Sequence, residues 1–409
     1  MPRLVHDRLT WLIYAQLGVW GFFLYGFGPI VPLLRDEQQT SAALASLHST
    51  GIAAGALIGG FIFPRVTGRI GRARTLWLAL AGVAVGVLGL CLFRPLPATI
   101  AAAVVISTFG TMLVSGVNVV LADHHGPASS AAISEANAAC AGMGFLAPVV
   151  IGLAVGAGYG WRPALAVEIA LITLVALAAV VFRVRLPRGT ATLTAAHSRP
   201  GRLPRTYWMA WVLMGVTGSI EVCLSLWTAD VLRSHAGMTP GGASAAVASI
   251  VGGMFLGRLA GGRVALRIPP VPLLLGALAV SAAGFAIFWV ATAGWLAVTG
   301  LVIVGIGNAM HYPLSISMAL AVAGGQADRA AAYSSYSVAI GFGIAPVALG
   351  WVADSIGSHR AFLLIPVFIA VAAVLAGRLG RSIRMRPVPV LPLDARPDGP
   401  AAPAVEAAL

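Results

Sequence analysis

Long apolar stretches, separated by short breaks that are polar or contain glycine, proline or arginine, recur along almost the whole chain. A helix of about 20 apolar residues is long enough to cross the roughly 30 Å hydrocarbon core of a bilayer. The pattern therefore predicts an all-α membrane protein with twelve transmembrane helices. The predicted spans are 9–34, 41–63, 75–93, 98–121, 131–156, 163–182, 206–231, 243–262, 271–292, 295–322, 331–352 and 360–378.

The longest polar interruption, 183–205, lies midway along the chain and contains three prolines and six arginines. It predicts a cytoplasmic linker between an N-terminal six-helix bundle, 1–182, and a C-terminal six-helix bundle, 206–378. The last segment, 379–409, is rich in proline, alanine and arginine without any period. We expect it to form a disordered cytoplasmic tail.

Short motifs of the first predicted bundle recur in the second. The motif Ala147-Pro148-Val149 recurs as Ala345-Pro346-Val347, and Gly68-Arg69-Ile70 recurs as Gly262-Arg263-Val264. The repeats stand at matching places, in the fifth and eleventh spans and after the second and eighth. Many transporter folds are built from internal repeats with the binding site between them, so the pattern favours two related halves.

Composition agrees with a membrane protein, since 59% of the residues are hydrophobic and only 10% are charged, against roughly 25% in soluble domains. The mean hydropathy is +0.91. Nothing resembles a phosphate-binding loop, a nucleophile elbow or a metal-ligand cluster. The three cysteines lie inside apolar spans without metal or redox spacing. We expect no enzymatic activity, no cofactor, no metal and no obligate protein partner.

The net charge of +13 comes from 26 basic residues, all of them arginines. If both termini are cytoplasmic, all but five arginines fall on the cytoplasmic side. The five exceptions are Arg35, Arg94, Arg162, Arg233 and Arg360. The asymmetry follows the positive-inside rule. It predicts a multi-pass protein of the bacterial inner membrane with both termini inside, and the charge requires no nucleic-acid partner. The first apolar stretch lacks a small-residue cleavage site and is expected to be a retained span.

Residues 64–74, interpreted as the loop after the second span, resemble the signature G-x-x-x-D-R-x-G-R-R of the major facilitator superfamily. Arg69, Gly71 and Arg72 match, whereas Pro64 and Gly68 replace the usual Gly and Asp. The resemblance covers 9–378 and implies that family's fold, with two pseudo-symmetric six-helix halves. It also implies alternating access, in which spans 1, 4, 7 and 10 line a central cavity. The candidate conformational residues are Arg69, Gly71, Arg72, Pro148, Pro346, Gly262 and Arg263.

Glu221 is the first candidate for chemistry, because a charge at the centre of a membrane helix costs roughly 2.5 to 3.5 kcal/mol on insertion scales. It falls near the middle of the seventh span, which the resemblance places at the cavity, where it would bind protons or solute. The alternative is a structural glutamate that is hydrogen-bonded to a neighbouring helix.

His311 in the tenth span could exchange protons with Glu221 or contact solute, since histidine titrates in the physiological range. A core histidine with satisfied hydrogen bonds is the alternative. Polar and aromatic residues of the first, fourth, seventh and tenth spans could form a wall for an apolar or cationic solute, or they could face lipid. These further binding candidates are Tyr312, Asn308, Gln16, Trp20, Tyr25, Asn118 and Trp227.

Glu135 and Asn137 in the fifth span and His48 in the second are candidate gating contacts, because the resemblance places these two spans at the border between the halves. They could equally be polar groups that reach water from inside a helix.

We therefore expect a secondary active transporter, with proton-coupled efflux of a hydrophobic or cationic small molecule as the first hypothesis. Its partners would be the small-molecule substrate, protons and the lipid bilayer. The alternative is proton-coupled uptake of an organic acid, sugar or amino-acid-like metabolite. A buried arginine near the midplane would have favoured acids, and we see none at that depth in the predicted spans. A non-transporting membrane sensor or scaffold is a third reading, which the short loops disfavour.

Overall fold

The computed structural model describes residues 5–125, 129–184, 186, 202–265, 267–323 and 327–384, and within these ranges all regular secondary structure is helical. The first bundle consists of α1 (Arg8–Gln38), α2 (Ala42–Ile70), α3 (Arg72–Leu92), α4 (Leu96–His125), α5 (Ser129–Gly156) and α6 (Trp161–Val181). The second consists of α7 (Arg205–Ser234), α8 (Pro240–Ala246), α9 (Ala248–Ala265), α10 (Pro270–Val290), α11 (Gly294–Asn308), α12 (His311–Ala321), α13 (Ala327–Ile356), α14 (Ser358–Ala361) and α15 (Leu364–Arg384).

The prediction of twelve transmembrane helices is confirmed, since twelve helical segments are long and apolar enough to cross a membrane. Three of these spans are interrupted and consist of α8 with α9, α11 with α12, and α14 with α15. Residues 379–384, which we assigned to the tail, instead form the last turns of α15. The rest of the tail and most of the predicted linker lie outside the described residues.

The segment 64–74, predicted as a loop, is almost entirely helical. Pro64 lies inside α2, which continues to Ile70, and Arg72 already begins α3. Gly71 alone makes the turn, with a φ of 80° that an L side chain rarely adopts. The prediction failed because hydropathy marks where the bilayer ends, whereas a helix can continue into water, where its backbone still forms internal hydrogen bonds.

Polar side chains define where several spans begin. The side chain of Asp7 accepts a hydrogen bond from the backbone N–H of Thr10 at 2.8 Å and so caps α1. Ser41 caps α2 and Thr239 caps α8 in the same way. Such caps satisfy N–H groups that have no partner inside the helix.

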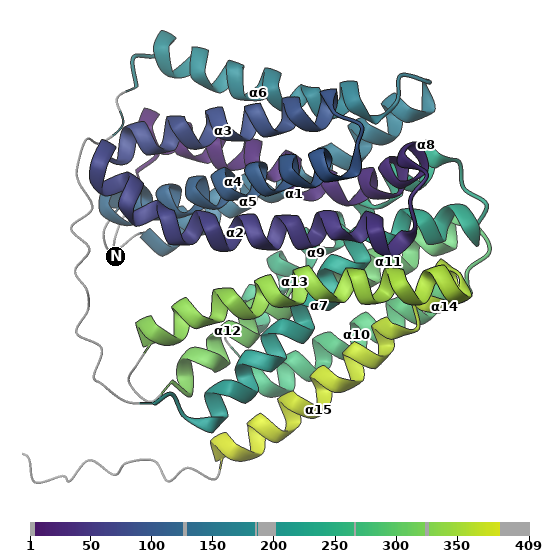
Figure 1. Ribbon diagram of the computed structural model, residues 1–409. Coiled ribbons are helices and arrows are strands. Elements are labelled where there is room, and N and C mark those ends of the chain that lie inside the picture. The colour runs from purple at the N-terminus through teal and green to yellow at the C-terminus, as the bar shows by residue number, and fades with distance from the viewer. Residues whose placement is uncertain are drawn as a thin grey trace, which may run out of the picture.

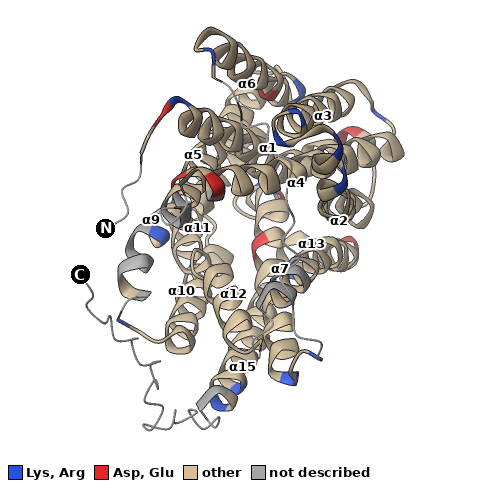
Figure 2. Cartoon of the chain, turned by 90° about the vertical axis from the view of Figure 1, so that its left-hand side faces the viewer, with Lys and Arg blue, Asp and Glu red and all other residues tan. Residues whose placement is uncertain are grey.

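The two bundles lie side by side, the first above the second in Figure 1. We call the side at which α1 begins and α15 ends the terminal side, and the opposite side the far side. The bundles converge on the far side, at the right of Figure 1, and diverge toward the terminal side. Figure 2 views the terminal side and shows basic residues at helix ends around both bundles.

Close glycine contacts determine the packing inside each bundle, and Gly305 of α11 is an example. A Cβ atom there would overlap the carbonyl oxygen of Ile250 in α9. We expect Gly305→Val to lower the free energy of unfolding by about 1–3 kcal/mol, which is the usual cost of overpacking a core. Thermal unfolding of the purified protein measures this loss. Gly276→Ala in α10 is the control, because no atom lies within 4 Å of the added Cβ; equal melting temperatures for both variants would contradict the packing.

Candidate functional site

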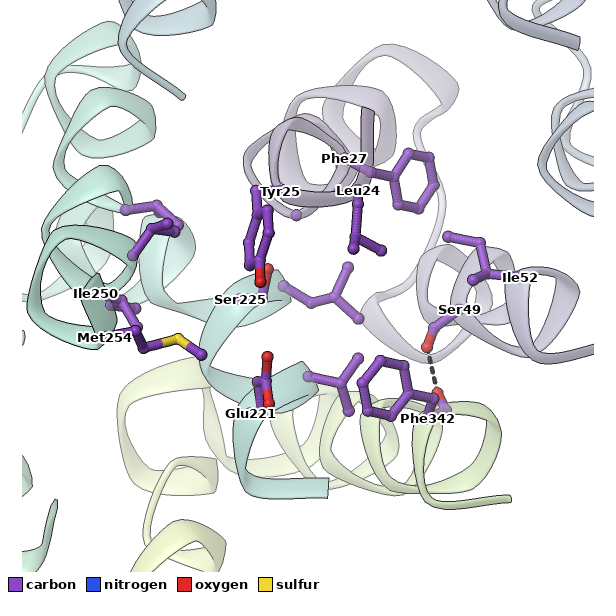
Figure 3. Close-up of a pocket in the computed structure, with 15 residues that line it drawn as sticks. Leu24, Tyr25, Phe27, Ser49, Ile52, Glu221, Ser225, Ile250, Met254 and Phe342 are labelled. Carbon is purple, nitrogen blue, oxygen red and sulfur yellow. Dashed lines mark hydrogen bonds between the residues drawn. The ribbon is translucent and has the colours of Figure 1, made fainter. Parts of the chain in front are cut away.

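A cavity of about 130 Å³ lies between the two bundles near the middle of the spans. It is lined by α1 and α2 from the first bundle and by α7, the α8–α9 span and α13 from the second. Figure 3 shows the 15 lining residues, most of which are apolar. The polar side chains among them are those of Tyr25, Ser49, Glu221 and Ser225. The cavity is therefore an apolar chamber with one carboxylate.

Glu221 lies near the middle of α7, and its carboxylate points into the cavity toward Ser225 and Tyr25 (Figure 3). The side chain is half-buried, and no hydrogen bond to it is seen among the described residues. Because an ionised carboxylate without partners is costly away from water, this group requires a proton or a cation whenever the cavity closes.

Arg258 is a second charged residue near the cavity, and it was not among our candidate site residues. It belongs to α9 and is the last residue of the eighth membrane span. Its side chain is exposed and lies close enough to interact electrostatically with Tyr25 and Glu221. Our sequence analysis counted it only among the cytoplasmic arginines, because it stands near the end of an apolar run and is followed by two more arginines.

Tyr312, predicted as a binding residue, also lies near the carboxylate. It follows the break between α11 and α12, its side chain is 49% exposed, and it interacts electrostatically with Glu221. Of the candidates from the sequence, Glu221 and Tyr25 therefore line the same cavity, and Tyr312 lies close enough to interact electrostatically with Glu221.

His311 and Asn308 do not join this group. The His311 ring is buried inside the second bundle, with Nε2 3.2 Å from the Ser281 hydroxyl of α10. The Asn308 side chain is also buried and approaches the Met254 sulfur at 3.9 Å. Both side chains contact neighbouring helices of their own bundle, and His311 Nδ1 and Asn308 Oδ1 have no hydrogen-bond partner among the described residues.

The remaining binding candidates are also packed away from the cavity lining. Trp20 stacks on Phe23 with ring centroids 5.6 Å apart and packs against Gly110 of α4. Gln16 and Trp227 are buried and have no hydrogen-bond partner for their side-chain polar atoms, and Asn118 is half-buried with an unpartnered Oδ1. The aromatic wall instead includes residues that the sequence did not single out, Phe27 and Phe342.

The predicted gating side chains make their described contacts inside the first bundle. Glu135 is hydrogen-bonded to His6 at 2.6 Å and to Tyr14 at 3.1 Å. His48 is buried, with Nε2 2.9 Å from the Thr99 hydroxyl. Asn137 donates to the Ile133 carbonyl of its own helix at 2.8 Å.

The predicted conformational residues of the signature motif also stay within one bundle. Arg72 forms an ion pair with Asp123 of α4, and Arg69 is exposed at the end of α2. Gly262 and Arg263 belong to α9, but their side chains are not among those that the structure describes.

Pro148 and Pro346 lie inside α5 and α13, and each precedes a glycine that touches the opposite bundle. A Cβ atom on Gly152 would lie 2.5 Å from the carbonyl oxygen of Gly241 at the start of α8. A Cβ atom on Gly350 would lie 2.8 Å from the carbonyl oxygen of Ala42 at the start of α2. Small residues of this kind let helix backbones approach closely in membranes.

Two ion pairs join the bundles at the far side. Arg35 of α1 pairs with Asp230 of α7 at 2.7 Å, and Arg233 of α7 pairs with Asp36 of α1 at 2.6 Å. Asp230 also accepts a hydrogen bond from the Ser358 hydroxyl. The arrangement is reciprocal, because each of the two helices supplies one arginine and one aspartate.

A carboxylate of one bundle caps a helix of the other on the same side. Asp354 of α13 accepts hydrogen bonds from the backbone N–H groups of Ala42 and Ala43, at 2.7 and 3.0 Å, in the first turn of α2. Nearer the cavity, Thr50 donates to the Gly343 carbonyl at 2.7 Å. The described hydrogen bonds and ion pairs between the bundles lie in the far-side half of the molecule. The structure is therefore closed on the far side.

No group of three or more histidine, cysteine, aspartate or glutamate side chains in the described part of the chain is arranged to hold a metal ion.

A family model described as Major Facilitator Superfamily matches residues 17–338 and 230–406. Solved structures of several transporters have the same fold. A bacterial homolog to the human lysosomal transporter Spinster, in an inward-facing and occupied conformation, has 14% sequence identity and a TM-score of 0.73, and the match covers 94% of this chain and 100% of that one. The peptide transporter POT, in complex with sulfate, has 15% identity and a TM-score of 0.74, with 94% and 96% covered.

The nucleoside transporter NupG has 13% identity and a TM-score of 0.73, and the match covers 91% of this chain and 98% of that one. At such low identities these likenesses concern the fold alone. No curated protein matches the chain at a significant level.

The far-side contacts generate a prediction about their relative strengths. The Asp230 side chain is only 8% exposed and the Asp36 side chain 40%. Asp230→Asn should therefore weaken far-side closure more than Asp36→Asn does. The expected loss is about 2 kcal/mol in Asp230→Asn, which removes a hydrogen-bonded charged group, and about 1 kcal/mol or less in Asp36→Asn, which removes an exposed ion pair.

Hydrogen exchange of the Ala42 and Ala43 amides measures this closure, because both are bonded to Asp354 only while the bundles meet. Exchange should be fastest in Asp230→Asn. Arg94→Gln is the control, since Arg94 is 80% exposed and pairs with Glu37 inside the first bundle. Unchanged exchange in Asp230→Asn would show that the ion pair does not hold the far side closed.

Proposed function

This chain belongs to the major facilitator superfamily and is a secondary transporter rather than an enzyme, and we propose that it exports a hydrophobic or cationic small organic molecule in exchange for protons. The observation that carries the proposal is the central cavity, in which Glu221 is the one carboxylate among mostly apolar lining residues. Apolar walls bind an apolar body, and a carboxylate in such surroundings attracts either a cation or a proton.

We propose that the membrane is the bacterial inner membrane and that the terminal side faces the cytoplasm. The support is the distribution of arginines, since helix ends on the terminal side carry most of those in the described ranges. With that orientation, far-side closure corresponds to a conformation that receives solute from the cytoplasm. Release outside would require the ion pairs of Arg35 and Arg233 to break and the bundles to close on the terminal side.

The coupling of proton movement to solute transport follows from the free-energy cost of burying an ionised Glu221 without a partner. When the cavity closes around Glu221 without a partner, the carboxylate loses its access to water, and the penalty for such a buried ion is several kcal/mol. Closure is then favourable only with a proton or a cationic group at Glu221. The transporter can therefore change between its two conformations only with a proton or a cationic solute bound at Glu221. Alternating access under this condition exchanges protons for solute.

The lipophilic cation tetraphenylphosphonium, used at saturating concentration, tests this competition. It should raise the melting temperature of the purified protein more at mildly alkaline than at mildly acidic pH, because protons compete for the same carboxylate. Glu221→Gln should abolish both the stabilisation and its pH dependence, while the variant itself remains folded. In proteoliposomes that contain a pH-sensitive dye, the same variant should lose proton movement driven by the cation gradient.

The matched control is Glu168→Gln, which neutralises a fully buried glutamate in α6 outside the cavity. It should keep the pH dependence of the wild type. If Glu221→Gln behaves like the wild type in both assays, Glu221 is not the coupling residue, and the proposed function loses its basis.

A further inference from the structure

We propose that the site takes a zwitterionic solute, with Glu221 as the partner of its cationic group and Arg258 as the partner of its anionic group. The proposal rests on the function proposed above for Glu221. It adds a second charged residue and narrows the class of substrate to molecules that carry both signs of charge on an apolar body.

Arg258 faces the same way as the cavity lining of its own span. Val247, Ile250 and Met254 line the cavity, and Arg258 follows Met254 by four residues. Residues spaced by three or four lie on one face of a helix. Arg258 is therefore one turn, or about 6 Å, closer to the terminal side at 1.5 Å per residue. A solute that enters from the terminal side passes the guanidinium before it reaches the carboxylate.

The guanidinium has unused capacity to bind an anion. No ion pair to it is seen in the described part of the chain, and its neighbour Tyr25 offers only a neutral hydroxyl, whereas an arginine carries five N–H donors in a fixed fork that matches a carboxylate or phosphate. The side chain is exposed rather than buried in the protein. An arginine in a membrane span is expensive unless it faces water or a partner, so its position beside the cavity indicates a role in binding.

The two charges interact without touching. Glu221 and Arg258 are close enough for an electrostatic interaction, yet they do not form an ion pair within 4 Å among the described residues. Together the two side chains would present a negative and a positive group to one solute. A molecule with an ammonium and a carboxylate group fits this dipole in one orientation, and its apolar part meets Met254, Leu226 and Phe342.

Charge balance separates a zwitterion from a simple cation. With Glu221 ionised, the pair has a net charge of zero. A bound monovalent cation compensates Glu221 but leaves the charge of Arg258 without an anionic partner, so in a medium of low dielectric constant it is a weaker ligand than a zwitterion of similar size. A zwitterion keeps the site neutral and compensates both residues. Electrostatic complementarity of this kind determines specificity more than it determines raw affinity.

Two matched series of small molecules test the proposal. One shares a phenyl group and comprises L-phenylalanine, phenethylamine and 3-phenylpropionate; the other shares an indole and comprises L-tryptophan, tryptamine and indole-3-propionate. Binding to the wild-type protein in nanodiscs should be at least about ten-fold tighter for each zwitterion than for its single-charge analogues. In Arg258→Gln the zwitterion should lose this advantage over the amine, whereas the affinity of the amine should stay equal or rise.

Two further variants separate charge from fold. Arg258→Lys keeps the charge and should retain part of the preference for the zwitterion, and Arg65→Gln, on the exposed face of α2, should behave like the wild type. Amines that bind as tightly as zwitterions to the wild type, or zwitterions of both series that fail to bind, would overturn the proposal. Neither result would affect the competition between protons and tetraphenylphosphonium at Glu221, so the two proposals fail separately.

Discussion

The electrostatic cost of a carboxylate in an apolar cavity is the constraint on which this molecule depends. Glu221 faces a chamber that is almost without other polar groups and lies at the boundary of two helical bundles. Such a charge must be compensated before water is excluded. The binding of a proton or a cationic group to the carboxylate therefore determines whether the bundles can close around it. Tyr25, Tyr312 and Arg258 are the polar groups near enough to influence that choice.

The far side is held closed by contacts suited to being made and broken. Backbones meet at Gly152 and Gly350, each of which lies against the start of the second span of the opposite bundle. The pair of Arg233 with Asp36 is partly exposed, so water can replace it at modest cost, whereas Asp230 is nearly buried and its pair with Arg35 is the stronger contact. The close packing at the glycines makes the two bundles complementary in shape, and the charged contacts can break and form again. This combination suits a protein whose bundles must separate on one side and meet on the other.

Much of the architecture could be predicted because the bilayer imposes a length and a polarity on every span. The count of twelve helices follows from that constraint, the family was indicated by the motif in residues 64–74, and Glu221 stood out as an ionisable residue in an apolar run. The face of each helix was harder to predict. His311 and Trp20 occupy the expected spans but point into their own bundles, since a nearly uniform apolar sequence does not indicate which face lies toward a cavity. Arg258 was not singled out because it stands at the end of an apolar run, although its spacing from Val247 and Met254 indicated that it lies on the same helix face as they do. The partners of Asp230 and Asp354 are far apart in sequence, and no local pattern connects them.

The central claim is that a proton and a cationic group of the solute occupy Glu221 in turn. Infrared difference spectroscopy tests it most directly, because the stretching band of a protonated carboxyl group is distinct from that of a carboxylate. Addition of a saturating cationic ligand to the purified protein at mildly acidic pH should remove one protonated-carboxyl band, and that band should be missing from Glu221→Gln. The account would be contradicted if no protonated-carboxyl band disappears when the ligand binds, or if the band that disappears in the wild type also disappears in Glu221→Gln.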